Sequence, residues 1–236
     1  LKAACIPFLR KITATVPQRK IYPQPETGGK VYFVDYDMVQ TELSLLGRAG
    51  KVDTSTFGRI NVFNEYFGSG LSSIIFQELR ESRSLAYSAY AVYQPSPELQ
   101  DADYITTYIG TQPDKLETAV QAMEELMVNL PKYEAQFESG RQATLKQLAS
   151  GRVTRTNIFF NHLRLQKLGI DYDLRKDMYA EVAELTLDGL EKFYKEKIQP
   201  VKYNVAVMGK RENLDQEVLG QMGTVSKLTL DEVFGY

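Results

Sequence analysis

The 236-residue sequence contains one histidine, one cysteine and no tryptophan. Catalytic zinc usually takes three protein ligands, but His162 stands in NHLRLQ with no second histidine near it, so neither HExxH nor HxxEH is present. A Ser-His-Asp triad is also excluded, because no GxSxG element accompanies His162. Cys5 has no internal disulfide partner, which leaves the redox compartment open. We therefore expect a chain without a metal site of its own, in which His162 serves as core or surface filler on an apolar-rich helix.

Long apolar runs are missing as well. No stretch approaches the roughly 20 residues needed to cross a bilayer, so no membrane span is expected. A net charge of −2, with 25% charged and 43% hydrophobic residues, gives no electrostatic reason to expect nucleic acid as a partner. Arg10, Lys11, Arg19 and Lys20 interrupt the N-terminal apolar stretches, which argues against a signal peptide. The sequence opens at Leu1 rather than methionine, so its localisation stays open.

Prolines and glycines divide the chain near residue 30. Residues 1–29 carry four prolines and the Gly28-Gly29 pair, which predicts a linker or incoming arm. Patterned sequence follows without an internal repeat, so we expect one domain over residues 30–236.

Alternating apolar and Tyr-rich segments predict strands near 31–34, 39–46, 86–94, 102–110 and 202–208. Helical spacing predicts a helix capped by Asp53. It also predicts helices near 71–80, 113–131, 133–150, 154–168, 186–198 and 214–222. Strands gather in clusters between runs of helices, without strict βα alternation. The expected fold class is therefore α+β, a two-layer sandwich with a mainly antiparallel sheet and helices packed on one face.

The most specific segment is FNEYFGSGLSSIIFQELRESRSLAYSAY, residues 63–90. It resembles the second-half, C-terminal-type domain of M16 (pitrilysin/insulinase-like) zinc metallopeptidases: a helix, a glycine-rich turn, a helix ending in Leu-Arg-Glu, then Leu-x-Tyr entering a strand. Gln40, the Pro113–Leu116 helix start, Leu185-Thr186 and Pro200 add support. The resemblance covers roughly residues 30–210.

The resemblance implies a LuxS-like metallohydrolase fold and a function shared between two domains. In this family a first domain binds zinc through HxxEH, and the second lacks that motif but lends an arginine and a tyrosine to the closed site. The matching positions here are Arg80 and Tyr87. No cofactor is then expected in this chain; zinc would lie in an HxxEH domain on the same chain or on a partner, and the substrate would be a peptide or small protein.

Arg80 and Tyr87 suit that role chemically. Metal-assisted hydrolysis of a peptide builds negative charge on the carbonyl oxygen, and both side chains donate hydrogen bonds without losing a proton. The alternative is that Arg80 only completes a solvated helix end and that Tyr87 is an ordinary strand residue. Arg83 is a nearby arginine at a different offset from Tyr87.

The Gly68-Ser69-Gly70 turn lacks the GxxxxGK[ST] spacing of a phosphate loop and follows a predicted helix rather than a strand. We interpret it as a helix-to-helix turn. In the M16 picture it lines the substrate chamber, with Ser69, Gly70, Ser72 and Ser73 near the peptide.

Three hypotheses follow for the function. The first is a non-zinc, substrate-clamping domain of a zinc peptidase, inactive in isolation. The second is a non-catalytic M16-like structural or assembly subunit. The third is a peptide-binding module that uses an exposed sheet edge. The presence of both Arg80 and Tyr87 favours the first.

Overall fold

A single mixed sheet organises the computed structural model, which describes residues 23–235. Its strands are β1 (Lys30–Asp35), β2 (Thr41–Lys51), β3 (Ser88–Gln94), β4 (Ala102–Thr111), β5 (Tyr203–Gly209) and β6 (Thr224–Leu228). They lie in the order β3-β4-β2-β5-β1-β6. The pairs β3–β4, β4–β2 and β2–β5 are antiparallel, whereas β1 runs parallel to both β5 and β6.

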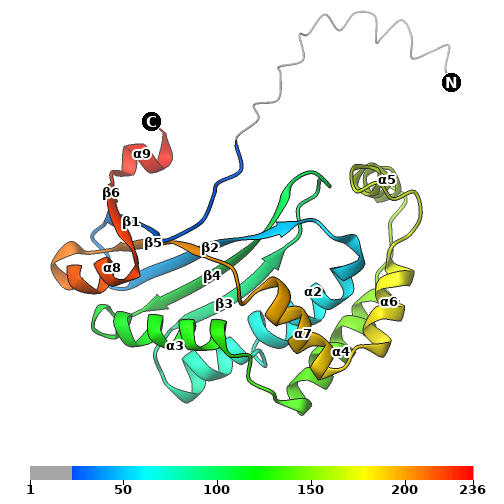
Figure 1. Ribbon diagram of the computed structural model, residues 1–236, viewed down its shortest axis with the longest axis horizontal. Coiled ribbons are helices and arrows are strands. Elements are labelled where there is room, and N and C mark those ends of the chain that lie inside the picture. The colour runs from blue at the N-terminus through cyan, green and yellow to red at the C-terminus, as the bar shows by residue number, and fades with distance from the viewer. Residues whose placement is uncertain (1–22, 236) are drawn as a thin grey trace, which may run out of the picture.

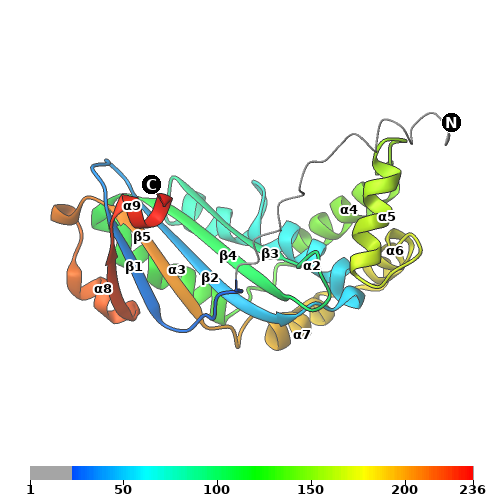
Figure 2. The ribbon, with the colours of Figure 1, turned by 90° about the horizontal axis from the view of Figure 1, so that it is seen from above.

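The main helices cover one face of this sheet (Figure 1). They are α2 (Phe57–Phe63), α3 (Leu116–Val128), α4 (Glu134–Ser150) and α7 (Leu187–Lys197). Helices α5 (Asn157–Lys167) and α6 (Arg175–Glu184) lie beyond one end of the sheet, while α8 (Gln216–Met222) and α9 (Leu230–Phe234) lie near the other, as Figure 2 also shows. The predicted α+β sandwich, with helices on one side of the sheet, is confirmed.

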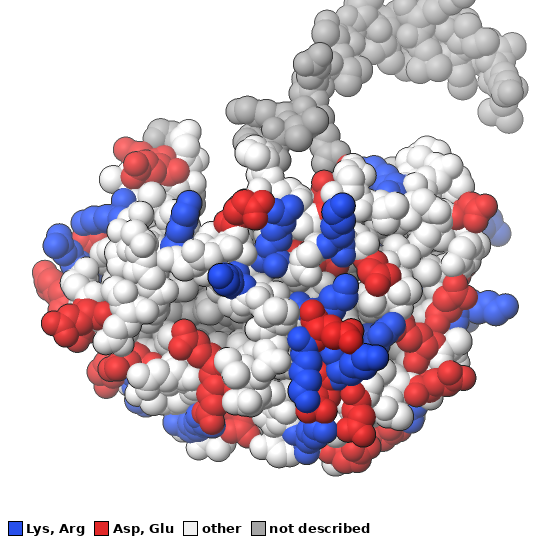
Figure 3. Space-filling model, viewed as in Figure 1, with Lys and Arg blue, Asp and Glu red and all other residues white. Residues whose placement is uncertain are grey.

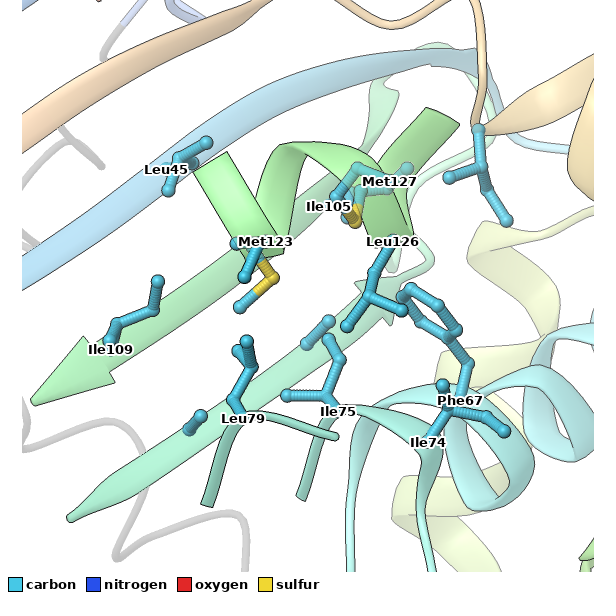
Figure 4. Close-up of a cluster of buried hydrophobic side chains, with 14 of the residues drawn as sticks. Leu45, Phe67, Ile74, Ile75, Leu79, Ile105, Ile109, Met123, Leu126 and Met127 are labelled. Carbon is cyan, nitrogen blue, oxygen red and sulfur yellow. The ribbon is translucent and has the colours of Figure 1, made fainter. Parts of the chain in front are cut away.

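Helix α3 shows how the two layers meet. Its apolar stripe, predicted from the spacing after Pro113, brings Met123, Leu126 and Met127 against the sheet residues Leu45, Ile105 and Ile109 (Figure 4). Figure 4 also places Leu79 and Ile75 in the same cluster. Burying one such side chain contributes about 1.5–3 kcal/mol. The cluster therefore includes Ile75 and Leu79, which precede residues 80–87, together with sheet and α3 residues that follow them.

Two short π-helical segments interrupt the 63–90 block: η2 (Asn64–Gly68) and η3 (Phe76–Ser82). The predicted helix at 71–80 instead begins at Ile74, and Leu71 is 72% exposed rather than part of the apolar face.

Gly68 explains the close packing of η2 against β3. A Cβ at this position would lie 1.8 Å from the carbonyl oxygen of Ala91, so η2 reaches β3 only because residue 68 is glycine. Wide π turns often occur at functional sites.

Some elements were not predicted. Helix α6 has a single buried residue, Val182, and strand β6 is largely exposed, so neither shows a clear apolar period. Strand β2 continues to Lys51, beyond the predicted end at 46. Within residues 23–235 no helix is long and apolar enough to span a membrane.

Part of the predicted linker can be placed. Residues 24–28 are bonded to the sheet: Gln24 accepts from the Ala102 amide, Thr27 from the Arg48 amide, and Glu26 pairs with Arg48. Residues 1–22 lie outside the described part of the chain.

Candidate functional site

Arg80 and Tyr87 line one pocket of about 300 Å³. The pocket lies where the end of η3, the start of β3 and the loop after β4 meet. Its other lining residues are Ser84, Leu85, Ala86, Gln112 and Lys115. Two cations therefore border the pocket, and no carboxylate residue is among those that line it.

The connection between Arg80 and Tyr87 is held firmly. Ser84 has a φ of 50°, the left-handed region that side chains other than glycine rarely adopt. Lys115 Nζ donates to the Ser84 carbonyl at 3.0 Å, and the hydroxyl of Thr111 donates to the Leu85 carbonyl. The amide of Tyr87 donates to the Gly110 carbonyl at 2.8 Å. Strained backbone of this kind persists where its surroundings determine it, often at ligand sites.

Arg80 lies in the last turn of η3 with its side chain half exposed. Its guanidinium carbon lies 4.8 Å from the centroid of the Phe76 ring, and its Nε is 3.7 Å from a carboxylate oxygen of Glu81. A stacking contact and one long ion pair orient the guanidinium but leave donors free for a ligand.

Arg83, the other candidate, is placed differently. It pairs with Glu125 at 3.1 Å and with Glu78 at 3.7 Å, and it does not line the pocket. Only Arg80 of the two shares a pocket with Tyr87.

Tyr87 is 51% exposed, so its ring borders the pocket rather than filling the core. Gln112 Nε2 donates to its hydroxyl oxygen at 2.7 Å. Because this bond uses the oxygen as an acceptor, the hydroxyl hydrogen remains available to donate to another group. Gln112 and Lys115 were not predicted as pocket residues, since neither belongs to a periodic apolar pattern.

Comparison with known proteins identifies the domain type. A family model described as the peptidase M16 inactive domain matches residues 6–144, more than half of the chain. The chain belongs to this family. The C-terminal-type M16 domain predicted from residues 63–90 is thereby confirmed. The family match starts upstream of the predicted domain boundary at residue 30.

Two relatives match over a shorter stretch of this M16 domain. The uncharacterized zinc protease YmxG of Bacillus subtilis is 32% identical over 69 residues, which is 29% of this chain and 16% of that protein. An uncharacterized zinc protease of Mycobacterium leprae is 31% identical over 71 residues, 30% of this chain and 15% of that protein.

Solved structures share the fold over most of the chain. A peptidase M16 inactive domain from Pseudomonas fluorescens has a TM-score of 0.63 at 17% identity, covering 81% of this chain and 46% of that one. A conserved protein from Enterococcus faecalis gives 0.68 at 15% identity, with 91% and 51% covered. A protease from Helicobacter pylori gives 0.62 at 14% identity, with 88% and 52% covered. This M16 domain thus spans about half the length of those chains.

The glycine-rich turn of the M16 domain does not join the Arg80 pocket. Ser69 donates through its hydroxyl to the Asn64 carbonyl, and Gly70 adopts a φ of 96° with open space around it. Ser73 is fully buried; its hydroxyl donates to the Gly70 carbonyl and accepts from the Phe76 amide, so it closes the turn and is not open to a peptide. Ser72 lines a separate pocket of about 380 Å³, which also includes Glu78 and Glu81.

Asp103, a buried acid, was not predicted from the sequence. Asp103 on β4 accepts from the Tyr93 hydroxyl at 3.0 Å and from the Ser96 amide at 2.9 Å. Burial raises the pKa of Asp103, an effect that these two hydrogen bonds oppose in part, and burial also raises the pKa of Tyr93. The pair fastens the β3–β4 hairpin. A larger pocket of about 530 Å³ lies beside this hairpin and shares no lining residue with the Arg80 pocket.

Charges of both signs are interspersed over the face seen in Figure 3, so no single sign dominates it. Within residues 23–235 no group of three His, Cys, Asp or Glu side chains is placed to hold a metal ion. His162 is exposed on α5.

Proposed function

We propose that this M16 domain is the non-zinc, substrate-clamping half of a zinc metallopeptidase, and that Arg80 and Tyr87 bind the carbonyl oxygen of the peptide bond being cleaved. The HxxEH half would lie on another part of the same chain or on a partner subunit. Family membership and the names of the two bacterial relatives support the peptidase assignment.

The observation that carries the proposal is the shared pocket of Arg80 and Tyr87. A guanidinium and a phenol hydroxyl both donate hydrogen bonds, and both keep their protons at neutral pH. When bound in the other half, zinc supplies an activated water for attack on the peptide. The two donors of this chain stabilise the negative charge that attack places on the carbonyl oxygen.

Preorganisation makes such donors effective, because little rearrangement is then needed in the transition state. Three interactions fix the geometry here. The Leu79 carbonyl accepts a hydrogen bond from the Leu85 amide at 2.8 Å. Lys115 donates to the Ser84 carbonyl, and Gln112 donates to the Tyr87 hydroxyl oxygen. Residues 80–87 therefore form a short rigid span with a donor at each end.

The test is Arg80→Ala in the complete peptidase, with its zinc half present. We expect kcat/KM for a peptide to fall on the order of 100-fold, the loss typical of one donor to a developing oxyanion. Arg83→Ala is the matched control. It removes an arginine of the same segment that pairs with Glu78 and Glu125 outside the pocket, and kcat/KM should stay within about three-fold, as befits a surface ion pair.

An equal loss for both arginines, with equal drops in Tm, would indicate general destabilisation and contradict the role of Arg80. Unchanged kinetics in Arg80→Ala would favour the second hypothesis, a structural or assembly subunit.

A further inference from the structure

Helix α5 exposes an unusual amount of apolar surface. Ile158 is 57% exposed, Phe159 61%, Phe160 67% and Leu163 40%, whereas Leu165 is the buried residue of this helix. The rings of Phe159 and Phe160 are in edge-to-face contact, with centroids 5.6 Å apart. A surface helix normally turns its apolar stripe toward a core. We define these four exposed residues, Ile158, Phe159, Phe160 and Leu163, as the α5 patch.

The helix is attached to the domain at its C-terminal end. Leu165 joins Leu168, Ile170, Leu174 and Val52 in a small core cluster separate from the main one. Figures 1 and 2 place α5 and α6 at the same end of the sheet, with α5 above α6 in Figure 1. A helix of 11 residues is marginal in water without packing, so the first two turns of α5 need a covering surface.

The α5 patch is too small to bind a second copy of this chain stably. A fully exposed side chain of this size presents on the order of 150–200 Å², and the four residues of the α5 patch are each only 40–67% exposed, so together they offer about 400 Å². A stable interface between separate molecules buries about 800 Å² on each partner. A small apolar patch is sufficient for contact with a domain that is joined to this one by a linker. The linker raises the effective concentration of that second domain to about the millimolar range.

The length of the related structures points to such a neighbour. This chain covers 46–52% of the three solved chains that share its fold, so those chains carry about as much polypeptide again. We infer that the α5 patch is the surface on which this domain packs against the zinc-binding domain of the same protein. This inference rests on the two-domain pairing in the proposed function, but not on the roles of Arg80 and Tyr87.

The experiment places the photo-crosslinking residue p-benzoyl-phenylalanine at position 160 of the complete protein. The inference predicts a crosslink to the zinc-binding domain within one molecule. A crosslink between two copies, a crosslink only to residues 1–22, or no crosslink would each overturn it.

A second measurement compares hydrogen exchange of residues 157–167 between the wild type and Phe159→Gln/Phe160→Gln. Glutamine favours helix at least as well as phenylalanine, so the change weakens docking and not the helix itself. Exchange should quicken at least about ten-fold. It should not change in the matched control Val39→Gln/Val128→Gln, which alters two exposed apolar residues elsewhere. Equal exchange in both variants would contradict the inference.

The two proposals fail separately. An intramolecular crosslink combined with unchanged kinetics in Arg80→Ala would leave the α5 patch standing and remove the catalytic role. Lost activity in Arg80→Ala without an intramolecular crosslink would support the catalytic role of Arg80 and contradict the proposed role of the α5 patch.

Discussion

Gln112 Nε2 donates a hydrogen bond of 2.7 Å to the hydroxyl oxygen of Tyr87. The two residues are 25 positions apart and meet because β3 pairs with β4, with Ser88 opposite Gly110. The direction of this bond decides what Tyr87 can do. An oxygen that accepts from an amide keeps its own hydrogen for a substrate, whereas an oxygen that donates to its neighbour does not.

Gln112→Glu reverses that direction, since a carboxylate only accepts. The Tyr87 hydroxyl would then donate to residue 112 and be lost to the substrate. We expect kcat of the complete peptidase to fall at least about ten-fold, while Gln112→Ala costs less because the hydroxyl stays free to donate. Steady-state kinetics of both variants check this. A larger loss in Gln112→Ala than in Gln112→Glu would contradict it.

Gly68→Ala should destabilise the domain by about 2–3 kcal/mol, as overpacking in a filled interior does. The added Cβ would lie 1.8 Å from the Ala91 carbonyl oxygen, so η2 and β3 would have to separate. Gly220→Ala is the matched control. Gly220 lies within α8 with open space around it, so alanine should raise stability by about 0.5–1 kcal/mol. Urea unfolding of both variants measures the difference, and equal effects would show that the close approach is unimportant.

Asp103 should give the domain a pH-dependent component of stability. Its pKa is raised by burial above the ordinary value of 3.8, so the folded state holds its proton more tightly than the unfolded state. The stability it contributes is complete below that ordinary value and is lost as pH rises through the folded-state pKa. The stability of the wild type relative to Asp103→Asn should therefore decrease as pH increases.

Urea unfolding of the two proteins from about pH 3.5 to pH 7 tests this dependence. A difference that grows with pH would mean that the folded state favours the ionised form of Asp103, contrary to the burial argument.

The sequence predicted much of the fold because its apolar periods are local. The stripe of α3 and the alternation of β2 can be read directly, and Asp53 caps the following helical turn as expected, accepting from the Ser55 amide. The parallel pairing of β1 with β5 and β6 has no such local pattern. The π turns have none either, and the close approach of Gly68 in η2 to Ala91 in β3 is a contact between distant segments that no local pattern predicts.

The candidate site was predicted only where its residues lie within one local segment of the sequence. Arg80 and Tyr87 belong to a recognisable segment, so the resemblance assigned both; their catalytic role stays a prediction. Gln112 comes from the other side of the β3–β4 pairing, and only the folded sheet brings it to Tyr87. The helix at 154–168 was predicted from its apolar residues, but those residues alone do not tell whether they face this domain or another.

The most direct test of the central claim is the steady-state kinetics of Tyr87→Phe in the complete peptidase. This change removes one hydroxyl and keeps the ring. If that hydroxyl stabilises the developing oxyanion, kcat should fall on the order of 100-fold while KM changes little. Tyr36→Phe, at a half-exposed tyrosine outside the pocket, should leave both constants unchanged. A raised KM with unaltered kcat, or no effect at all, would contradict a role for Tyr87 in the transition state.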